Sequence, residues 1–252
     1  MKIKRVLIGA LIIGIIFMTP SYKSFVLISN EMRNQKVMVI DPGHGGMDGG
    51  ASSESGIQEK NINLEIAKEL RKEAEKYGFR VVMTREEDIG LYDENNSVIR
   101  SKKIQDLKGR KKIIDEVKPD LTVSIHLNSF KEDKRVRGAQ VFYPKYADEQ
   151  MVAASGKAIA ESVQKALEAS IDDGKERFAM AKNDIYLFKD VYTPIILVEC
   201  GFLSNFDDEK NLKTPAFQQK VARSIMGGIA KYYGINIQKR LKVIDSGEQR
   251  KS

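Results

Sequence analysis

Residues 36–50 read KVMVIDPGHGGMDGG, a short apolar run that leads into a glycine-rich loop. The β-branched residues of the run predict a buried strand over 36–40, which ends where Asp41 and Pro42 begin the loop. Five of the ten residues from 41 to 50 are glycine, and His44 stands among them. Such a loop could cradle a phosphate, form a flexible turn, or bend the backbone to hold His44 at one point. The rest of the sequence has to decide between the three.

Strand-like and helical patterns alternate along the rest of the chain. Apolar residues recur every three or four positions from Glu59 to Tyr77, which predicts a helix that Gly78 ends. Further helices are predicted over about 98–117, 147–169 and 215–233, and further strands over 79–84, 121–128, 138–144 and 193–202. This alternation indicates a single α/β domain, over residues 36–234, in which a mostly parallel twisted sheet is flanked by helices.

The first thirty residues differ from the rest of the chain. Lys2, Lys4 and Arg5 precede VLIGALIIGIIFM at 6–18, an apolar run without a polar face. Its thirteen residues are too few for a membrane-spanning helix, which needs about 20, and they match the core of an export signal. We therefore expect residues 1–30 to be a signal peptide or a signal anchor, with a membrane tether through 6–18 in the second case. The polar residues 238–252 predict a frayed tail.

Charge and cysteine content exclude some classes of function. The chain has a net charge of +7, and four of these positive charges lie in residues 1–30, which contain no acidic residue. The remaining excess is too small to indicate nucleic-acid binding. Cys200 is the single cysteine, so an intramolecular disulfide and a zinc site built from several thiolates are both excluded.

Three residues that can bind metals or transfer protons fall near the carboxyl ends of predicted strands. His44 follows the strand at 36–40, and His126, the second of the two histidines, lies near the end of the strand at 121–128. Glu199 lies near the end of the strand at 193–202. In open α/β sheets ligands bind beyond these strand ends, and two imidazoles with carboxylates are the ingredients of a catalytic zinc site. Glu59, which follows the glycine-rich loop and opens a helix, could be the third ligand.

Each of these residues also has a structural interpretation. His44 could be a solvated or capping residue, and Glu59 could stabilise the amino end of its helix through the helix dipole. A carboxylate after the apolar PIILV is costly to bury unless it is paired or metal-bound, which favours a functional role for Glu199. Cys200 could be a nucleophile paired with His126, but adjacent strand residues face opposite sides, and a buried cysteine is the commoner case.

A phosphate cradle fits the loop less well. A dinucleotide-binding loop has the pattern G-x-G-x-x-G and leads directly into a helix. Here GHGGMDGG matches that spacing only loosely, and about eight residues separate it from Glu59. An exported protein also meets little NAD or ATP. We therefore favour a loop that is bent to place His44.

Four blocks of the chain closely resemble the signature of zinc-dependent N-acetylmuramoyl-L-alanine amidases of the amidase-3 type. They are VIDPGHGGMDGGA, QEKNINLEIA, TVSIHLNS and PIILVECGFLSN, which occur in this order within residues 36–234. Leu107 with Arg110, the block GAQVFY and Arg177 support the resemblance.

The resemblance implies that His44, Glu59 and His126 hold zinc and that Glu199 is the catalytic glutamate. Zinc lowers the pKa of its bound water toward 7, and Glu199 would act as general base on that water and pass the proton to the leaving amine. The bond cut would be the amide between the lactyl group of N-acetylmuramic acid and L-alanine in peptidoglycan.

This sequence departs from the family pattern at positions that are not themselves implied ligands. Leu127 stands where many members have alanine, and Cys200 where leucine or isoleucine is common. The polar insert at 86–105 matches less clearly than the four blocks.

The combination of an export segment with a bare catalytic domain is similar to sporulation- and germination-associated amidases, which act on spore cortex on the route to muramic-δ-lactam. This similarity implies that the enzyme acts in the cell wall or the cortex space. It is also compatible with an accessory protein that targets or activates the enzyme. Two other functions remain open: a catalytically inactive, membrane-tethered peptidoglycan-binding protein, and a cysteine peptidase that uses Cys200.

Overall fold

The computed structural model describes residues 35–95, 97–147, 149–171 and 175–238. Two compact units divide the chain, Met1–Lys36 and Val37–Ser252, and the elements below belong to the second. The strands are β1 (Val37–Pro42), β2 (Arg80–Met83), β3 (Leu121–Asn128), β4 (Gln140–Pro144), β5 (Met180–Lys182) and β6 (Ile195–Phe202). The helices are α3 (Glu59–Lys76), α4 (Ile99–Val117), α5 (Gln150–Ser170), α6 (Phe206–Leu212) and α7 (Pro215–Tyr233), with a 3-10 turn η1 (Tyr186–Phe188).

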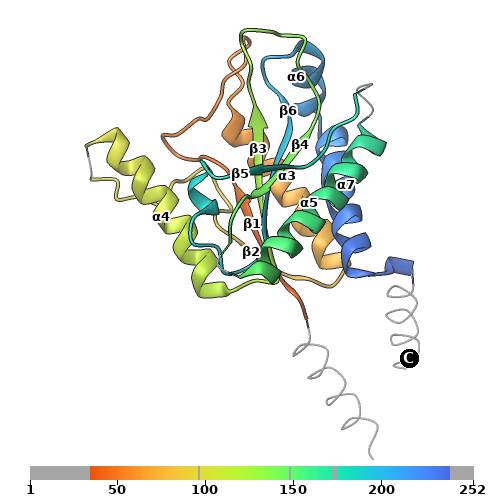
Figure 1. Ribbon diagram of the computed structural model, residues 1–252. Helices are drawn as coiled ribbons and strands as arrows, with labels where there is room; N and C mark the ends of the chain where they lie inside the picture. Colours follow the sequence, from red (N-terminus) through yellow and green to blue (C-terminus); the bar gives the residue numbers. More distant parts are fainter. Residues whose placement is uncertain (1–34, 96, 148, 172–174, 239–252) are drawn as a thin grey trace, which may run out of the picture. The chain divides into compact units, whose positions relative to one another are not determined.

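The strands form one sheet in the order β2-β1-β3-β6-β4-β5 (Figure 1). β2, β1, β3 and β6 run parallel, whereas β4 pairs with β6 in the antiparallel direction and pairs with β5 in parallel. The predicted α/β fold with a mostly parallel sheet flanked by helices is confirmed. The antiparallel pair has a local cause, because residues 129–139 between β3 and β4 contain no helix that could form a crossover to a parallel strand.

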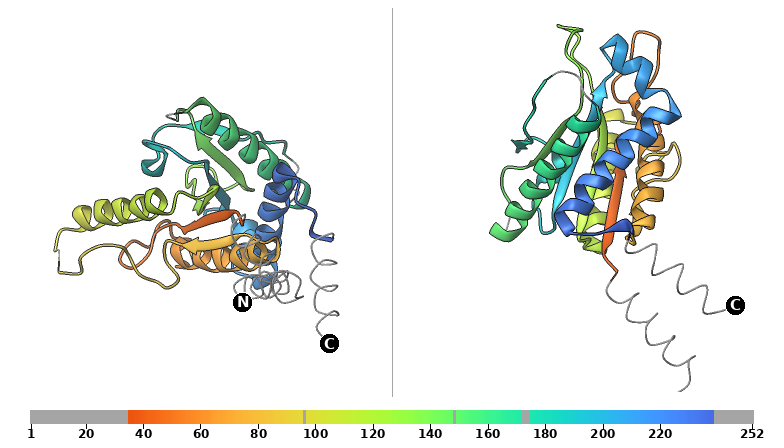
Figure 2. Two further views of the ribbon diagram at one scale, coloured as in Figure 1. Left: turned by 90° about the horizontal axis from the view of Figure 1, so that it is seen from below. Right: turned by 90° about the vertical axis from the view of Figure 1, so that its right-hand side faces the viewer.

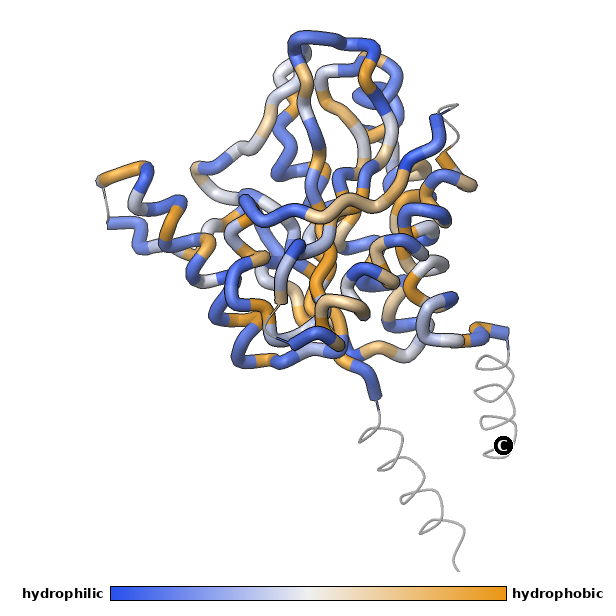
Figure 3. Tube along the Cα trace, in the orientation of Figure 1, coloured by the Kyte–Doolittle hydropathy of each residue, from blue (hydrophilic) through white to orange (hydrophobic). Residues whose placement is uncertain are grey.

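Helices cover both faces of the sheet. α5, α7 and α3 lie side by side on one face, and α4 with η1 lies on the other (Figure 2). Alternate strand residues serve the two faces: Ile196 and Val198 join the core under α3, α5 and α7, whereas Ile195 and Leu197 pack with η1 and α4. Hydrophobic residues concentrate along the central strands, while hydrophilic and hydrophobic positions alternate along α4 (Figure 3). Both faces of the central strands β1, β3 and β6 are therefore buried.

The same alternation places three polar residues on the α4 side of the sheet. Val39 of β1 and Leu197 of β6 both pack toward α4. Asp41 lies two residues after Val39, and Glu199 lies two residues after Leu197, so Asp41 and Glu199 face the same side of the sheet. His126 of β3 is the register partner of Glu199 and shares its face. Polar side chains of three neighbouring strands therefore meet near the carboxyl ends of those strands.

Local signals account for the carboxyl end of α3 and for both ends of α7. Gly78 takes φ 87° directly after α3, a left-handed conformation that glycine adopts without strain. α7 begins after Thr214, whose side chain accepts a hydrogen bond from the backbone N–H of Phe217 at 3.4 Å, and it has Pro215 in its first turn. Gly234 ends α7 with φ 65°. The boundaries predicted for these two helices agree with the structure to within one residue.

Three short elements were not predicted from the sequence. β5 and η1 each contain three residues and α6 contains seven, which is too short for a periodic pattern to stand out. α6 does carry a capping signal, because the side chain of Asn205 accepts hydrogen bonds from the N–H groups of Asp207 and Asp208 at 3.1 and 3.0 Å.

Two predictions fall outside the described residues: the export segment at 1–30 and nearly all of the polar tail at 238–252. Within the residues that the structure describes, none of the helices combines the length and the hydropathy that crossing a membrane requires.

Candidate metal centre

Neighbouring strands bring the predicted site residues to one end of the sheet. β1, β3 and β6 are adjacent and parallel, and His44 follows β1 by two residues. His126 and Glu199 pair in register near the carboxyl ends of β3 and β6. The residues come from distant parts of the sequence, and the strand order alone explains why they meet.

A tight turn in the glycine-rich loop sets the position of His44. The residue itself has φ 62°, which is uncommon for a side chain other than glycine. Gly45 and Asp48 exchange two backbone hydrogen bonds of 3.0 Å, which close the turn directly after His44. Gly45 and Gly46 have φ values of 139° and 55°, so this turn requires their freedom from a β-carbon. The loop is therefore a shaped turn and not a slack linker.

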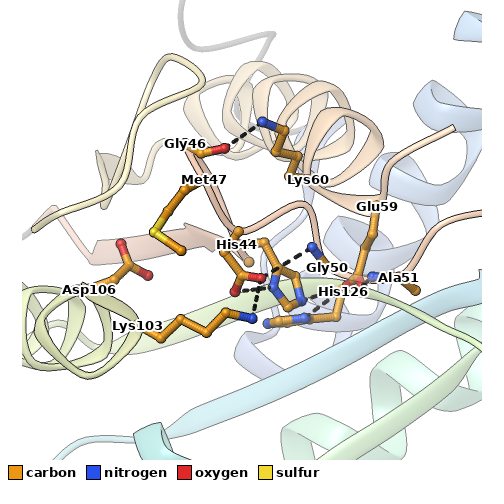
Figure 4. Close-up of polar contacts among 12 residues, drawn as sticks. His44, Gly46, Met47, Gly50, Ala51, Glu59, Lys60, Lys103, Asp106 and His126 are labelled. Atoms are coloured by element: carbon orange, nitrogen blue, oxygen red, sulfur yellow. Dashed lines mark hydrogen bonds and ion pairs between the residues drawn. The ribbon is translucent and has the colours of Figure 1, made fainter. Parts of the chain in front are cut away.

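Glu59 lies between the two imidazoles. Its Oε1 is 3.3 Å from Nε2 of His44 and 3.1 Å from Nδ1 of His126, and the three side chains point toward one another (Figure 4). The chain returns to this point because residues 52 and 58 form a β-bridge, after which the N–H of Glu59 donates to the carbonyl of Ala51 at 2.9 Å. Glu59 is 3% exposed, so its carboxylate is held inside the protein and not at the surface of α3.

Backbone and side-chain donors orient the Glu59 carboxylate further. Oε2 accepts a hydrogen bond from the N–H of Ala51 at 2.8 Å, and Oε1 accepts one from the N–H of Leu127 at 3.0 Å. Asn63, one turn later on α3, donates from Nδ2 to Oε1 at 3.2 Å and to the carbonyl of Gly43 at 3.2 Å. Both carboxylate oxygens are therefore fixed by the fold.

The donor atoms suit a transition metal. One atom each from His44, Glu59 and His126 lies within 4.8 Å of the other two. Two imidazole nitrogens and one carboxylate oxygen form a common ligand set of catalytic zinc sites, in which a fourth position stays open for water or substrate. The chemistry of the residues present therefore fits zinc.

Two glycines form walls of this centre. A β-carbon added to Gly43 would lie 2.7 Å from Nδ1 of His126 and closer still to other atoms of that ring. A β-carbon on Gly50 would lie 2.7 Å from Cδ2 of His44 and would also overlap the side chain of Glu59. Such distances are shorter than any normal contact, so these glycines allow the backbone to approach the ligand side chains.

The electrostatics of the three side chains reflect their proximity. Burial lowers the pKa of His44, but hydrogen bonds to Asp48 and Glu59 outweigh burial and raise its pKa to about 9. Burial raises the pKa of Glu59, but the contacts with His126 and His44 hold that pKa well below its usual range. The carboxylate is therefore ionised at neutral pH, and a bound metal ion would displace the proton that His44 carries.

Glu199 adjoins the centre without belonging to the donor cluster. Its Oε2 is inaccessible to solvent and has no hydrogen-bond partner among the described residues. Burial raises the pKa of Glu199 to about 7, and the negative charge of Glu59 acts in the same direction. A buried carboxylate with one free oxygen and a pKa near neutrality can accept and release a proton.

Cys200 faces away from this centre. It is 1% exposed within the core under α3, α5 and α7, and its Sγ lies 3.6 Å from the carbonyl of Val198. Burial raises the pKa of this thiol well above its usual value. A thiolate nucleophile is therefore disfavoured at this position.

Two arginines that sequence reasoning did not assign to the site hold the backbone of the glycine-rich loop. Arg110 of α4 donates to the carbonyl of Pro42 at 2.7 Å and to the carbonyl of His44. Arg85, which follows β2, donates to the carbonyls of Pro42 and Gly43 at 2.9 and 3.1 Å. Arg110 matched the family pattern in the sequence, whereas Arg85 gave no signal beyond its place after a predicted strand.

Asp41 balances the charge of Arg110 in the interior. The two residues are 1% and 2% exposed, and Oδ1 of Asp41 lies 2.7 Å from Nη1 of Arg110. Ser124 and Thr84 each donate a further hydrogen bond of 2.7 Å to Asp41. Burial raises the pKa of Asp41, but Arg110 and the two hydroxyl groups outweigh burial and lower its pKa to about 2. Asp41 is thus part of an ion pair that fixes α4 against β1.

Comparison with protein families places most of this unit in one family. The family model described as N-acetylmuramoyl-L-alanine amidase matches residues 38–231. The germination-specific N-acetylmuramoyl-L-alanine amidase of Bacillus subtilis is 37% identical to the chain over 198 residues, which are 79% of this chain and 80% of that protein.

Solved structures of amidases are also similar to this chain. The CwlD amidase of Clostridioides difficile, solved in complex with the GerS lipoprotein, superposes with a TM-score of 0.74 and 41% identity, over 80% of this chain and 100% of that one. The amidase AmiC2 of Nostoc punctiforme superposes with a TM-score of 0.66 and 32% identity, over 79% of this chain and 97% of that one.

Proposed function

This chain belongs to the family of N-acetylmuramoyl-L-alanine amidases, and we propose that it hydrolyses peptidoglycan with zinc held by His44, Glu59 and His126. The bond cut by this class of enzyme joins the lactyl group of N-acetylmuramic acid to L-alanine. One observation carries the zinc proposal: imidazole nitrogens of His44 and His126, from separate segments, converge on Oε1 of Glu59, beside the partly buried Glu199.

The chemistry divides between the metal and Glu199. Zinc, when bound, supplies a Lewis acid that polarises a carbonyl and lowers the pKa of water toward 7. Glu199 would remove one proton from the attacking water, whose oxygen forms the new bond to the scissile carbonyl carbon. As the carbon–nitrogen bond breaks, Glu199 returns the proton to the nitrogen. The muramic acid keeps a carboxyl group, and the stem peptide leaves with a free amine.

Spore cortex is the proposed form of the substrate. The Bacillus subtilis relative is described as germination-specific, and it matches 79% of this chain. We propose on this basis that the amidase acts on cortex peptidoglycan, on the route to muramic-δ-lactam. Muropeptide analysis of cortex from spores that lack the protein tests this role. We expect muramic-δ-lactam to be lost, and an unchanged muropeptide profile would contradict the role.

The proposed place of action is outside the cytoplasmic membrane, in the cell wall or the cortex space. The substrate is found there, and the basic and apolar residues 1–18 have the pattern of an export segment. Whether residues 6–18 are removed or stay as a tether is measured directly by N-terminal sequencing of the protein recovered from membranes and wall.

An accessory protein is the third part of the proposal. The CwlD neighbour was solved with a lipoprotein bound, and this chain covers the whole of that amidase. We propose that a partner targets or activates the present enzyme as well. Equal activity of the purified chain alone and of the chain in wall extracts would remove the reason for a partner.

Metal removal separates the proposed mechanism from its alternatives. A zinc amidase loses activity with EDTA and recovers when zinc is added, and it resists iodoacetamide because Cys200 is buried. Zinc content and the digestion products are measured on the same sample, the latter by mass spectrometry of peptidoglycan digests. A peptidoglycan-binding protein without activity would give no new amine, and a cysteine peptidase would respond to iodoacetamide and not to EDTA.

A further inference from the structure

Two charged residues connect His44 to helix α4. Nδ1 of His44 lies 2.8 Å from Oδ2 of Asp48, and Oδ1 of Asp48 lies 2.8 Å from Nζ of Lys103. Lys103 extends from α4 toward the loop that carries His44 (Figure 4). Asp48 uses a different oxygen for each partner, so the two contacts can exist at the same time.

The contacts give the two nitrogens of His44 different roles. Nδ1 faces the Asp48 carboxylate, which accepts a hydrogen bond from that nitrogen, and Nε2 faces Glu59 at 3.3 Å. A carboxylate on one nitrogen fixes the tautomer and the ring orientation, and it leaves the other nitrogen unprotonated for a metal ion. Asp48 therefore selects Nε2 as the donor atom of His44.

Helix α4 holds His44 at two points. Arg110 binds the backbone carbonyl of His44, and Lys103 binds the carboxylate that orients its side chain. Arg110 and Lys103 lie seven residues apart, which is two helical turns, so both project from one side of α4. A movement of α4 relative to β1 would therefore change the backbone and the ring of the same residue.

We propose that Asp48 is a positioning residue for His44 and that Lys103 acts through Asp48, so that the placement of α4 sets the metal affinity of the centre. The inference rests on the proposed zinc site. Lys103 is half exposed and Asp48 is 22% exposed, which makes their ion pair a moderate contributor and the Asp48–His44 contact the larger one.

Zinc affinity of four variants tests the chain of contacts. The full chain and its variants Asp48→Asn, Lys103→Met and Asp48→Asn/Lys103→Met are titrated with zinc in competition with a chelating dye. We expect Asp48→Asn to weaken zinc binding by about 10- to 100-fold. Lys103→Met should weaken it by roughly two- to fivefold. The double variant should bind zinc as Asp48→Asn does, because among the described residues Lys103 contacts the loop of His44 through Asp48. Lys112→Met, on the same helix and paired with Glu116, is the matched control and should bind zinc like the wild type.

Nitrogen NMR of the zinc-loaded protein separates positioning from a general loss of structure. His44 and His126 are the two histidines of the chain, so two imidazole spin systems are observed. Asp48→Asn should shift the Nδ1–H resonance of His44 and leave the ring resonances of His126 in place, whereas a structural defect would move the resonances of both residues.

The outcomes are distinct. Normal zinc affinity of Asp48→Asn, or losses that multiply in the double variant, would overturn the proposal. A wild-type chain that binds no zinc would instead contradict the proposed zinc site.

Discussion

His126 of β3 and Glu199 of β6 are register partners on adjacent parallel strands. Partner positions in a ladder share a face of the sheet, so the proposed zinc ligand and the proposed base leave the sheet side by side. Their separation is set by backbone hydrogen bonds and not by a flexible loop. Each side chain can therefore be removed without displacing the other.

Removal of the Glu199 side chain should separate catalysis from metal binding. We expect Glu199→Ala to keep its zinc, because Glu199 lies outside the donor cluster, and to lose about 10²- to 10⁴-fold in hydrolysis. Zinc content and release of stem peptide from purified peptidoglycan are measured on one preparation. Glu65→Ala, an exposed change on α3, serves as the control. Normal turnover of Glu199→Ala would show that the proton acceptor is another group.

Removal of the His126 side chain should abolish both properties. His126→Ala leaves two donors where a catalytic zinc site uses three, so we expect loss of bound zinc and of hydrolysis together. Metal analysis after dialysis and the peptidoglycan assay measure the two effects, while circular dichroism verifies the fold. A variant that retained one zinc per chain would remove His126 from the proposed ligand set.

A methyl group at Gly43 should weaken the metal centre without straining the backbone. Gly43 is not among the glycines with positive φ, so alanine is allowed there, but its β-carbon would overlap the ring of His126. Overpacking of this kind costs about 1–3 kcal/mol, and we expect Gly43→Ala to lower zinc affinity by about tenfold or more. Gly227→Ala, where a β-carbon meets no atom within 4 Å, should bind zinc normally. Equal affinities of the two variants would mean that the ring can move aside.

The buried pair of Asp41 and Arg110 should make stability depend on acid pH. The folded pKa of Asp41, about 2, lies below its ordinary value of 3.8, so its contribution is complete above about pH 4 and is lost as the pH falls to about 2. At pH 7 Asp41→Asn leaves Arg110 with Asp106 as its remaining carboxylate partner among the described residues, and we expect a loss of about 2 kcal/mol in the free energy of unfolding, in line with the lowered pKa of Asp41. Between pH 4 and pH 2 the difference from the wild type should shrink by about 2 kcal/mol.

Urea unfolding at several pH values measures this difference. Asp115→Asn removes an exposed partner of Lys111 on the same helix and should change the free energy of unfolding little at any pH. A gap between the wild type and Asp41→Asn that stayed constant from pH 7 to pH 2 would contradict the assigned pKa of Asp41.

The sequence predicted the parts of the fold that repeat a pattern. Apolar runs gave β1, β3 and β6, and helical spacing gave α3 and α7, because burial of one face leaves a period in the sequence. The meeting of His44, His126 and Glu199 at one end of the sheet follows from those strands once they are adjacent and parallel. The direction of β4 did not follow, since an apolar run carries no information on which way its strand will pair.

The contacts that support the site could not be predicted from the sequence, for a different reason. Lys103 lies 55 residues from Asp48, and Arg110 lies 69 residues from Asp41. A single ion pair between two loops or helices occurs once in the chain, so it leaves no periodic pattern in the sequence. A buried lysine or arginine also looks like a surface residue until its acceptors are known. The sequence therefore contains no sign that Asp48 contacts a proposed ligand.

Arg85 and Arg110 donate hydrogen bonds to the loop carbonyls, so the glycine-rich motif alone does not determine the conformation of the loop. Neither guanidinium belongs to the motif, and both come from segments more than 40 residues away. A synthetic peptide of residues 40–50 would contain the histidine and all five glycines, yet it would lack both guanidinium groups that bind the loop carbonyls. The position of His44 therefore depends on Arg85 and Arg110 as well as on the glycines of the motif.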